Sequence, residues 1–173
     1  MSRLRRPFLY DRYIFVTVDL LESRTQLNER DYARLAISLT RMRQKHGFLL
    51  TAWVFLPDHW HAIICPPYPL TISRVFQAVK VSSMIAINHG RGESGELWQG
   101  RFFDRALRTV KEYVDTVEYI HLNPVRRGLV KRAEDWKWSS VHEYGGMSAE
   151  EQERRCGLRI DRVRLPADEN ARI

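Results

Sequence analysis

The chain has 173 residues, 44% of them hydrophobic, which suffices for one domain with a buried core and is too little for two full domains. Its 28 Lys and Arg residues outnumber 21 Asp and Glu residues, and the net charge of +7 favours an anionic partner such as nucleic acid, although charge alone leaves a merely soluble basic protein open. Two cysteines exclude a disulfide framework, and the lack of a long apolar window excludes a membrane span, so we expect a cytoplasmic protein without a membrane partner.

The first part of the chain predicts a strand, a helix and a hairpin. Residues 13–19 are rich in β-branched and aromatic side chains, which suit a partly buried strand. Apolar residues then recur at helical spacing up to Gly47, where the helix should stop. Two residues qualify as the N-terminal cap of this helix, namely Asn28 and Asp31. Residues 49–56 and 60–65 are short apolar runs separated by a Pro-Asp-His break, which predicts a pair of strands.

The middle of the chain predicts a second helix, a fourth strand and a third helix. The helix occupies residues 71–92, and the strand residues 98–107, where aromatic and charged residues alternate. The third helix covers residues 110–123 and is closed by Pro124. The order βαββαβ, followed by a helix, indicates an α+β, ferredoxin-like fold: a four-stranded antiparallel sheet with two helices on one face. This fold hosts many functions and identifies none.

The end of the chain predicts an extension and a tail. Three aromatic residues are expected to pack a short C-terminal extension onto the core: Trp136, Trp138 and Tyr144. The stretch after Met147 is dense in Glu and Arg, which favours a mobile charged tail. We therefore expect one domain over residues 1–146, beginning with a basic arm at residues 1–10, and a tail over residues 147–173.

A pair of histidines begins the predicted strand 60–65. Because side chains alternate along a strand, His59 and His61 share one face and Trp60 lies on the other. Two imidazoles on one face can hold a divalent ion and leave positions open for a substrate phosphate. The plainer alternative is polar packing. Cys65 is too far along the strand to join them, about 13 Å from His61, and is read as a small buried hydrophobe.

The third helix carries a tyrosine and an asparagine on its polar side. Its apolar side should consist of Val110, Tyr113, Val114, Val117, Ile120 and His121. Tyr119 lies on the opposite side, so its hydroxyl should reach a polar cleft, although an ordinary surface tyrosine has the same pattern. Asn123 follows one turn later and offers an amide oxygen to a hard ion such as Mg²⁺ or Mn²⁺; equally, Asn before Pro can simply end a helix.

These residues lie within four segments that together resemble the REP-associated tyrosine transposases, a branch of the single-tyrosine HUH transposases of IS200-like elements. The segments are WVFLPDHWHA (53–62), LWQGRFF (97–103), YIHLNPVRRGLV (119–130) and WKWSS (136–140). The resemblance covers most of residues 10–145. It implies the same fold that the order of predicted elements indicates, and it makes residues 1–146 an HUH transposase domain.

The resemblance also implies roles. His59 and His61 would be metal ligands, Asn123 would complete the metal site, and Tyr119 would be the nucleophile. The substrate would be single-stranded DNA beside a palindromic hairpin such as a REP repeat, cut through a covalent 5′-phosphotyrosine by a monomer or homodimer that needs Mg²⁺ or Mn²⁺. One departure is Asp58, where Asn commonly precedes the histidines; it adds a carboxylate beside them.

Two other functions remain open on the sequence: a domesticated regulator that binds nucleic acid without cutting it, and a metal-dependent hydrolase that uses water. The intact set of His59, His61, Tyr119 and Asn123 argues against the first. Candidates for contacts with the DNA backbone are Arg3, Arg5, Arg6, Arg74, Lys80, Arg101 and Arg105. Candidates for stacking on unpaired bases are Trp98, Phe102 and Trp138.

Overall fold

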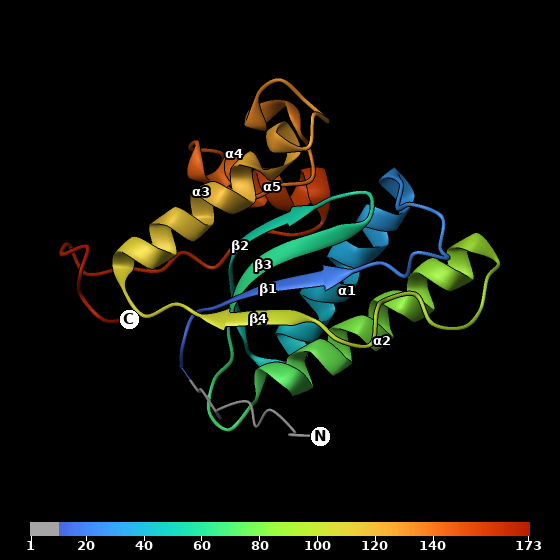
Figure 1. Ribbon diagram of the computed structural model, residues 1–173, viewed down its shortest axis with the longest axis horizontal. Helices are drawn as coiled ribbons and strands as arrows, with labels where there is room; N and C mark the ends of the chain where they lie inside the picture. Colours follow the sequence, from blue (N-terminus) through green and yellow to red (C-terminus); the bar gives the residue numbers. More distant parts are fainter. Residues whose placement is uncertain (1–10) are drawn as a thin grey trace.

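The computed structural model describes residues 11–173, which fold around a four-stranded antiparallel sheet (Figure 1). Its strands are β1 (Ile14–Asp19), β2 (Leu49–Phe55), β3 (His59–Cys65) and β4 (Phe103–Ala106). They lie in the order β2-β3-β1-β4, with every neighbouring pair antiparallel. This is the expected ferredoxin-like arrangement, so the predicted fold class is confirmed.

Helices cover both faces of the sheet. Helix α1 (Glu29–His46) and helix α2 (Ile72–Arg91) pack side by side on one face, and helix α3 (Val110–Arg126) crosses the other (Figure 1). No helix in the described part of the chain is long and apolar enough to cross a membrane. The two faces have separate apolar clusters, one joining the sheet to α1 and α2 and one joining it to α3.

Alternation along the strands decides which residues meet which helices. In β3, Trp60 and Ala62 join the cluster under α1 and α2, whereas Ile63 joins the cluster under α3. In β1, Val16 faces the α1 and α2 layer and Phe15 faces α3. His59 and His61 alternate with Trp60 and therefore lie on the α3 face, as the sequence predicts.

The start of α1 settles the choice of cap. The side chain of Asn28 accepts hydrogen bonds from the backbone N–H groups of Arg30 and Asp31, at 2.9 and 3.3 Å. The carboxylate of Asp31 accepts one in return from the N–H of Asn28 at 3.1 Å. Asn28 is thus the N-cap and Asp31 its reciprocal partner in a capping box. Gly47 ends the helix with a φ of 72°, which favours glycine.

Two elements have boundaries that differ from those predicted. The fourth strand begins at Phe103, and Trp98 makes only an isolated bridge with Leu20. In between, the Lys80 ammonium donates hydrogen bonds to the backbone carbonyls of Gln99 and Gly100. Helix α3 runs past Pro124 to Arg126. A proline removes one hydrogen bond to the carbonyl four residues back and its ring crowds that carbonyl, and α3 ends two residues after it.

The C-terminal extension packs as expected, and the tail differs from its prediction. Trp136 donates its indole N–H to the carbonyl of Phe55 at 2.9 Å, and the Tyr144 hydroxyl donates to the carbonyl of Thr51 at 2.8 Å. This region contains η1 (Ala133–Asp135), α4 (Val141–Tyr144) and α5 (Ala149–Cys156). Beyond Met147, where a mobile tail was expected, Cys156 and Leu158 are buried.

The rest of this segment also packs against the core, up to the last residues of the chain. The backbone N–H of Val110 donates to the carbonyl of Ala171 at 3.1 Å, next to a bridge between Thr109 and Arg172. Val163 and Leu165 pack against the α3 cluster. A few well-placed apolar residues therefore hold a stretch whose composition is mostly charged, and composition alone cannot detect such contacts.

A buried carboxyl group in this extension makes folding sensitive to pH. Glu143 is 2% exposed, and burial raises the pKa of its carboxyl to about 7, even though an N–H from Ile160 and the charges of Arg162, Arg43 and Arg159 act in the opposite direction. Because this pKa is raised on folding, the carboxyl's contribution to stability is complete below the ordinary value of 4.5 and is lost as pH rises through 7.

We therefore expect Glu143→Gln to gain stability relative to the parent protein as pH rises. Gln keeps an oxygen for the Ile160 N–H and cannot ionise. The difference in free energy of unfolding should change in favour of the variant by about 3 kcal/mol between pH 4.5 and 8, at 1.36 kcal/mol for each unit of pKa. Urea denaturation of both proteins at the two pH values measures it. The same difference at both pH values would contradict the prediction.

Candidate active site

Three predicted ligand residues converge where α3 crosses β3. The Nε2 atoms of His59 and His61 are 3.1 Å apart, and the Asn123 amide nitrogen lies 3.1 Å from the Nε2 of His61. All three side chains are buried, with exposed fractions of 8%, 3% and 6%. Asn123 belongs to α3 and the histidines to β3, so packing of the helix on the sheet assembles the group.

Neighbouring side chains fix the rings of both histidines. The Nδ1 of His59 lies 2.6 Å from a carboxylate oxygen of Asp58, whose other oxygen accepts from Arg127 at 2.6 Å. A carboxylate only accepts hydrogen bonds, so this Nδ1 bears the hydrogen and Nε2 of a neutral ring has a free lone pair. The Nδ1 of His61 lies 2.8 Å from the Thr17 hydroxyl, which can accept in the same way.

The electrostatics match this arrangement. Burial alone would raise the pKa of Asp58, but hydrogen bonds from His59 and Arg127 lower it, so the carboxylate stays ionised. Burial, followed by the nearby His59, lowers the pKa of His61 to about 3. His61 is therefore neutral at physiological pH, as a metal ligand must be.

These residues fit a divalent cation. Two neutral rings whose Nε2 lone pairs face each other at 3.1 Å repel unless a cation or proton lies between them. The Oδ1 of Asn123 is buried and has no hydrogen-bond partner among residues 11–173, and a half-turn of the amide exchanges it with the nitrogen beside His61. Within the same residues, no three His, Cys, Asp or Glu side chains form a metal-binding group, so a cation held here would have two imidazoles and one amide as its protein ligands.

Tyr119 lies beside this group with its ring partly open to solvent. It is 38% exposed, and its ring centroid is 5.5 Å from that of His61 and 5.8 Å from that of Phe15. The Arg126 guanidinium lies 5.3 Å from the same ring. Tyr113 differs: it is 4% exposed and its hydroxyl lies 3.2 Å from that of Tyr144. The structure thus separates an accessible tyrosine from a structural one.

The polar and apolar sides of α3 differ in part from the prediction. Val114, expected on the core side, is 53% exposed, whereas Thr116 and Asn123, expected on the polar side, are buried. The helix lies between the sheet and the C-terminal extension, so it buries two sides and not one. Asn123 lies on the side of α3 that faces β3, which brings it to the histidines.

Comparison with known proteins identifies the family. Residues 11–123 match the family model for "Transposase IS200 like". The chain belongs to this family of transposases. It is 34% identical to the REP-associated tyrosine transposase of Escherichia coli K12, over 82% of this chain and 84% of that protein. A Haemophilus influenzae protein provisionally given the same name is 29% identical, over 82% and 86%.

Solved structures agree. A structure of a REP-associated tyrosine transposase bound to a REP hairpin matches with a TM-score of 0.72 and 33% identity, over 83% of this chain and 84% of that one. The resemblance stated from the four sequence segments is therefore confirmed. Membership makes the chain an enzyme of the DNA-cleaving transposase class.

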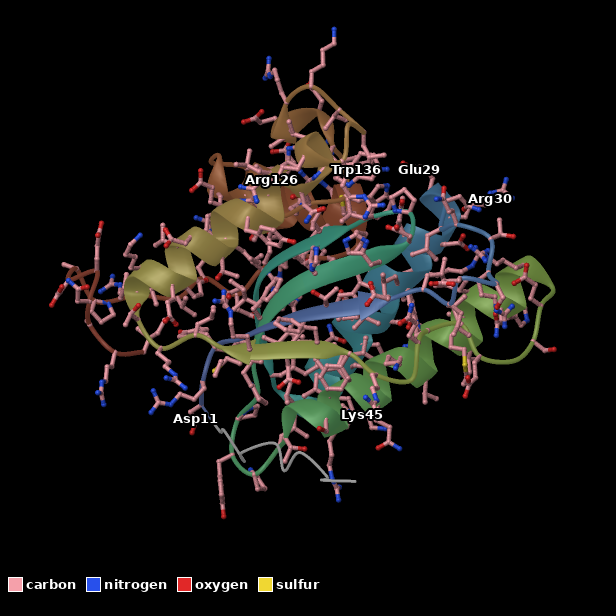
Figure 2. The ribbon with its side chains drawn as sticks, in the orientation of Figure 1. Asp11, Glu29, Arg30, Lys45, Arg126 and Trp136 are labelled. Carbon is pink, nitrogen blue, oxygen red and sulfur yellow. The ribbon has the colours of Figure 1, made fainter. Side chains whose placement is uncertain are left out.

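Basic residues of this transposase are spread over both faces of the sheet, and Figure 2 shows nitrogen-tipped side chains on many sides of the fold. Arg74 and Lys80 belong to α2, on the face away from Tyr119, and burial lowers the pKa of Lys80. Arg101 is exposed before β4. Arg105 lies beside Tyr119 in a shared pocket and donates to the Thr116 hydroxyl at 3.2 Å. Three further candidates lie outside the described residues: Arg3, Arg5 and Arg6.

The predicted base-stacking residues of the transposase have structural roles instead. Trp98 and Trp138 are each 3% exposed, and Phe102 stacks on Phe76 with centroids 4.4 Å apart. The next residue, Phe103, is 55% exposed and lines the pocket at Tyr119. Neighbouring residues of an extended segment point to opposite faces, and Phe103, which the sequence did not single out, is the one on the α3 face.

Sequence reasoning also missed Arg126 and Arg127. Arg126 lies over the Tyr119 ring, and Arg127 anchors Asp58, which in turn orients His59. Both follow Pro124, where the helix was expected to have ended. The helical spacing from Tyr119 to Arg126, seven residues, would have indicated the shared side had the helix been extended past the proline.

Proposed function

We propose that this transposase is a metal-dependent endonuclease and strand transferase that cuts single-stranded DNA beside palindromic hairpin repeats, with Tyr119 as nucleophile. The observation that carries the proposal is the convergence of accessible Tyr119 with His59, His61 and Asn123 at one point of the sheet. A relative whose structure is described as bound to a REP hairpin supports the substrate class. A DNA substrate supports a cytoplasmic location for the enzyme.

The proposed metal site would consist of His59, His61 and Asn123. When bound there, Mg²⁺ or Mn²⁺ supplies a Lewis acid that polarises a phosphate oxygen and stabilises charge developing on it. Asp58 and Thr17 hold the two imidazoles in the orientation that points both Nε2 atoms at the same place. Partners that orient ligands in this way support metal affinity strongly.

The covalent step follows from the position of Tyr119. Its Oη attacks phosphorus, the bond from phosphorus to the 3′ oxygen breaks, and the 5′ phosphate remains on Tyr119. The proton of the tyrosine leaves to solvent, and the departing 3′ oxygen takes up a proton to become a hydroxyl. One phosphoester bond forms for each that breaks, so rejoining to another 3′ hydroxyl needs no external energy source. Arg126 contributes positive charge beside the ring.

The test compares one strand in three forms: with its hairpin and flanking single strand, without the hairpin, and annealed to its full complement. We expect a covalent protein–DNA adduct on a denaturing gel for the first, less for the second and very little for the duplex. A phosphate within a regular duplex does not easily enter a site between a helix and a sheet, whereas a flexible strand bends into it. Backbone charge contributes to binding in all three forms, so binding should weaken with salt for each.

Three outcomes would contradict the proposal. Equal adduct formation from all three forms would remove the requirement for a hairpin and a single strand. Binding of the hairpin without any adduct would instead support the regulator, and cleavage without an adduct would support a hydrolase that uses water.

A further inference from the structure

A pocket of about 360 Å³ lies beside the proposed nucleophile, on the side of Tyr119 away from Asn123. Its walls come from β1, β4 and α3, and the residues are Phe15, Phe103, Arg105, Asp115, Thr116 and Tyr119. Three of these residues contribute aromatic rings, namely Phe15, Phe103 and Tyr119. The charged groups of Arg105 and Asp115 lie at the rim. An isolated exposed aromatic residue is ordinary on a protein surface, but here Phe103 is 55% exposed directly beside the reactive hydroxyl's ring.

The register of the sheet relates this pocket to the metal site. His61 pairs with Thr17, and Thr17 pairs with Phe103, so the three side chains form a row on the face that α3 covers. Neighbouring strands are about 4.8 Å apart, which puts Phe103 about 10 Å from His61. That is the scale of one nucleotide, from its phosphate to the outer edge of its base.

From this geometry we infer that the pocket receives the unpaired base of the nucleotide that stays linked to Tyr119, with Phe103 as its stacking surface. This inference rests on the proposed function. The occupant is the first base on the 3′ side of the cut, and Phe103 acts as a positioning residue for the scissile phosphate.

The direction of attack selects this base over its neighbour. In a phosphoryl transfer, the attacking and leaving oxygens lie roughly in line with phosphorus between them. The leaving 3′ oxygen and its nucleotide are therefore on the far side of phosphorus from Tyr119. The nucleotide that remains is attached through an oxygen to the side of this line, so its base extends past the tyrosine ring. The pocket that Tyr119 itself lines is at that position.

The pocket's chemistry suits any base and favours an unpaired one. Every nucleobase has a flat face that can stack on an aromatic ring, and such stacking tolerates sequence variation. The Arg105 guanidinium, which donates to Thr116 at 3.2 Å, adds a positive charge at the rim where the phosphate backbone must pass. A base that is paired and stacked in a duplex cannot reach Phe103 without leaving its partner, so the pocket selects for single-stranded DNA at this position.

The experiment combines one change in the protein with one in the DNA. The cut in a hairpin strand with a single-stranded flank is first mapped on a denaturing gel, and the base 3′ of it is then replaced by an abasic site. With Mn²⁺ present, the parent protein should form adduct about tenfold more slowly on the abasic strand. Phe103→Ala should be about tenfold slower than the parent on the intact strand and should show no further loss on the abasic strand.

Three further variants control for structure. Phe103→Trp keeps a stacking surface and should restore the difference between the two strands. Phe103→Leu keeps an apolar contact with Phe15 and should behave like Phe103→Ala. Ile85→Ala removes a side chain that is 60% exposed on α2, on the other face of the sheet, and should match the parent protein on both strands.

The outcomes distinguish this inference from the function on which it rests. An unchanged rate on the abasic strand with the parent protein overturns the inference without recourse to any variant. The inference is also overturned if Phe103→Ala and Phe103→Leu are slower than the parent protein by the same factor on the intact strand and on the abasic strand. The ring would then act on something other than the base. If the parent protein forms no adduct with any strand, the proposed function fails and the inference fails with it.

Discussion

Tyr119→Phe is expected to abolish formation of the covalent adduct while leaving folding and DNA binding nearly intact. The change removes one oxygen from a side chain that is 38% exposed at the surface of α3, so little packing is lost. A phenylalanine ring keeps its edge contacts with Phe15 and His61. Without the oxygen nothing on this helix position can attack phosphorus, and the rate of adduct formation should fall by roughly a thousandfold or more.

Tyr113→Phe is the matched control. It removes the same atom from the same helix, but from a hydroxyl that lies 3.2 Å from the Tyr144 hydroxyl in the core. We expect a loss of about 1 kcal/mol in stability and adduct formation near the parent rate. Adducts are counted on denaturing gels and binding by fluorescence anisotropy of a labelled hairpin. An adduct with Tyr119→Phe and none with Tyr113→Phe would show that the nucleophile is the other tyrosine.

The second large effect concerns the histidines. His61→Ala should remove metal-dependent cleavage, and excess chelator should reproduce that loss in the parent protein, because both imidazoles point their Nε2 atoms at one place. His59→Ala should have the same effect and leave the Asp58–Arg127 ion pair in position. Calorimetric titration with Mn²⁺ gives a readout that does not depend on DNA. Each variant should lose at least about tenfold in affinity.

His89→Ala controls for loss of a histidine as such, since His89 is exposed at the end of α2 on the other face of the sheet. It should cut DNA and bind Mn²⁺ like the parent protein. Full cleavage by the parent protein in excess chelator, or by a protein lacking both His59 and His61, would contradict the metal assignment.

The fold was predictable because its patterns are local. Alternation in β1 and β3 and helical spacing in α1 and α2 each depend on residues close in sequence, and together they specify the order βαββαβ. Alternation also placed His59 and His61 on one face. The capping choice between Asn28 and Asp31 could not be decided, because both belong to the same capping box.

The parts that could not be predicted depend on contacts between distant segments. Asn123 is buried because the side of α3 that carries it packs against β3, where it meets His61, and periodicity within the helix does not show which strand lies opposite. Phe103 and not Phe102 lines the pocket at Tyr119, whereas Phe102 stacks on Phe76 of α2 on the other face of the sheet. The stretch after Met147 is dense in charged residues, yet Leu158 within it is fully buried. In each instance, residues distant in the sequence determine whether a side chain is buried or which face of the sheet it occupies.

Helix α3 contributes both Tyr119 and Asn123, and the histidines they meet belong to the same chain. If the proposed roles hold, each copy of the protein therefore contains His59, His61, Asn123 and Tyr119 in one chain, and we expect it to cut without a group from a neighbour. In a mixture of intact and Tyr119→Phe chains, cleavage should decline in simple proportion to the fraction of disabled copies. In a cell that acquires one defective gene copy beside an intact one, the disabled chain would compete with the intact chain for DNA but would take no cutting group away from it.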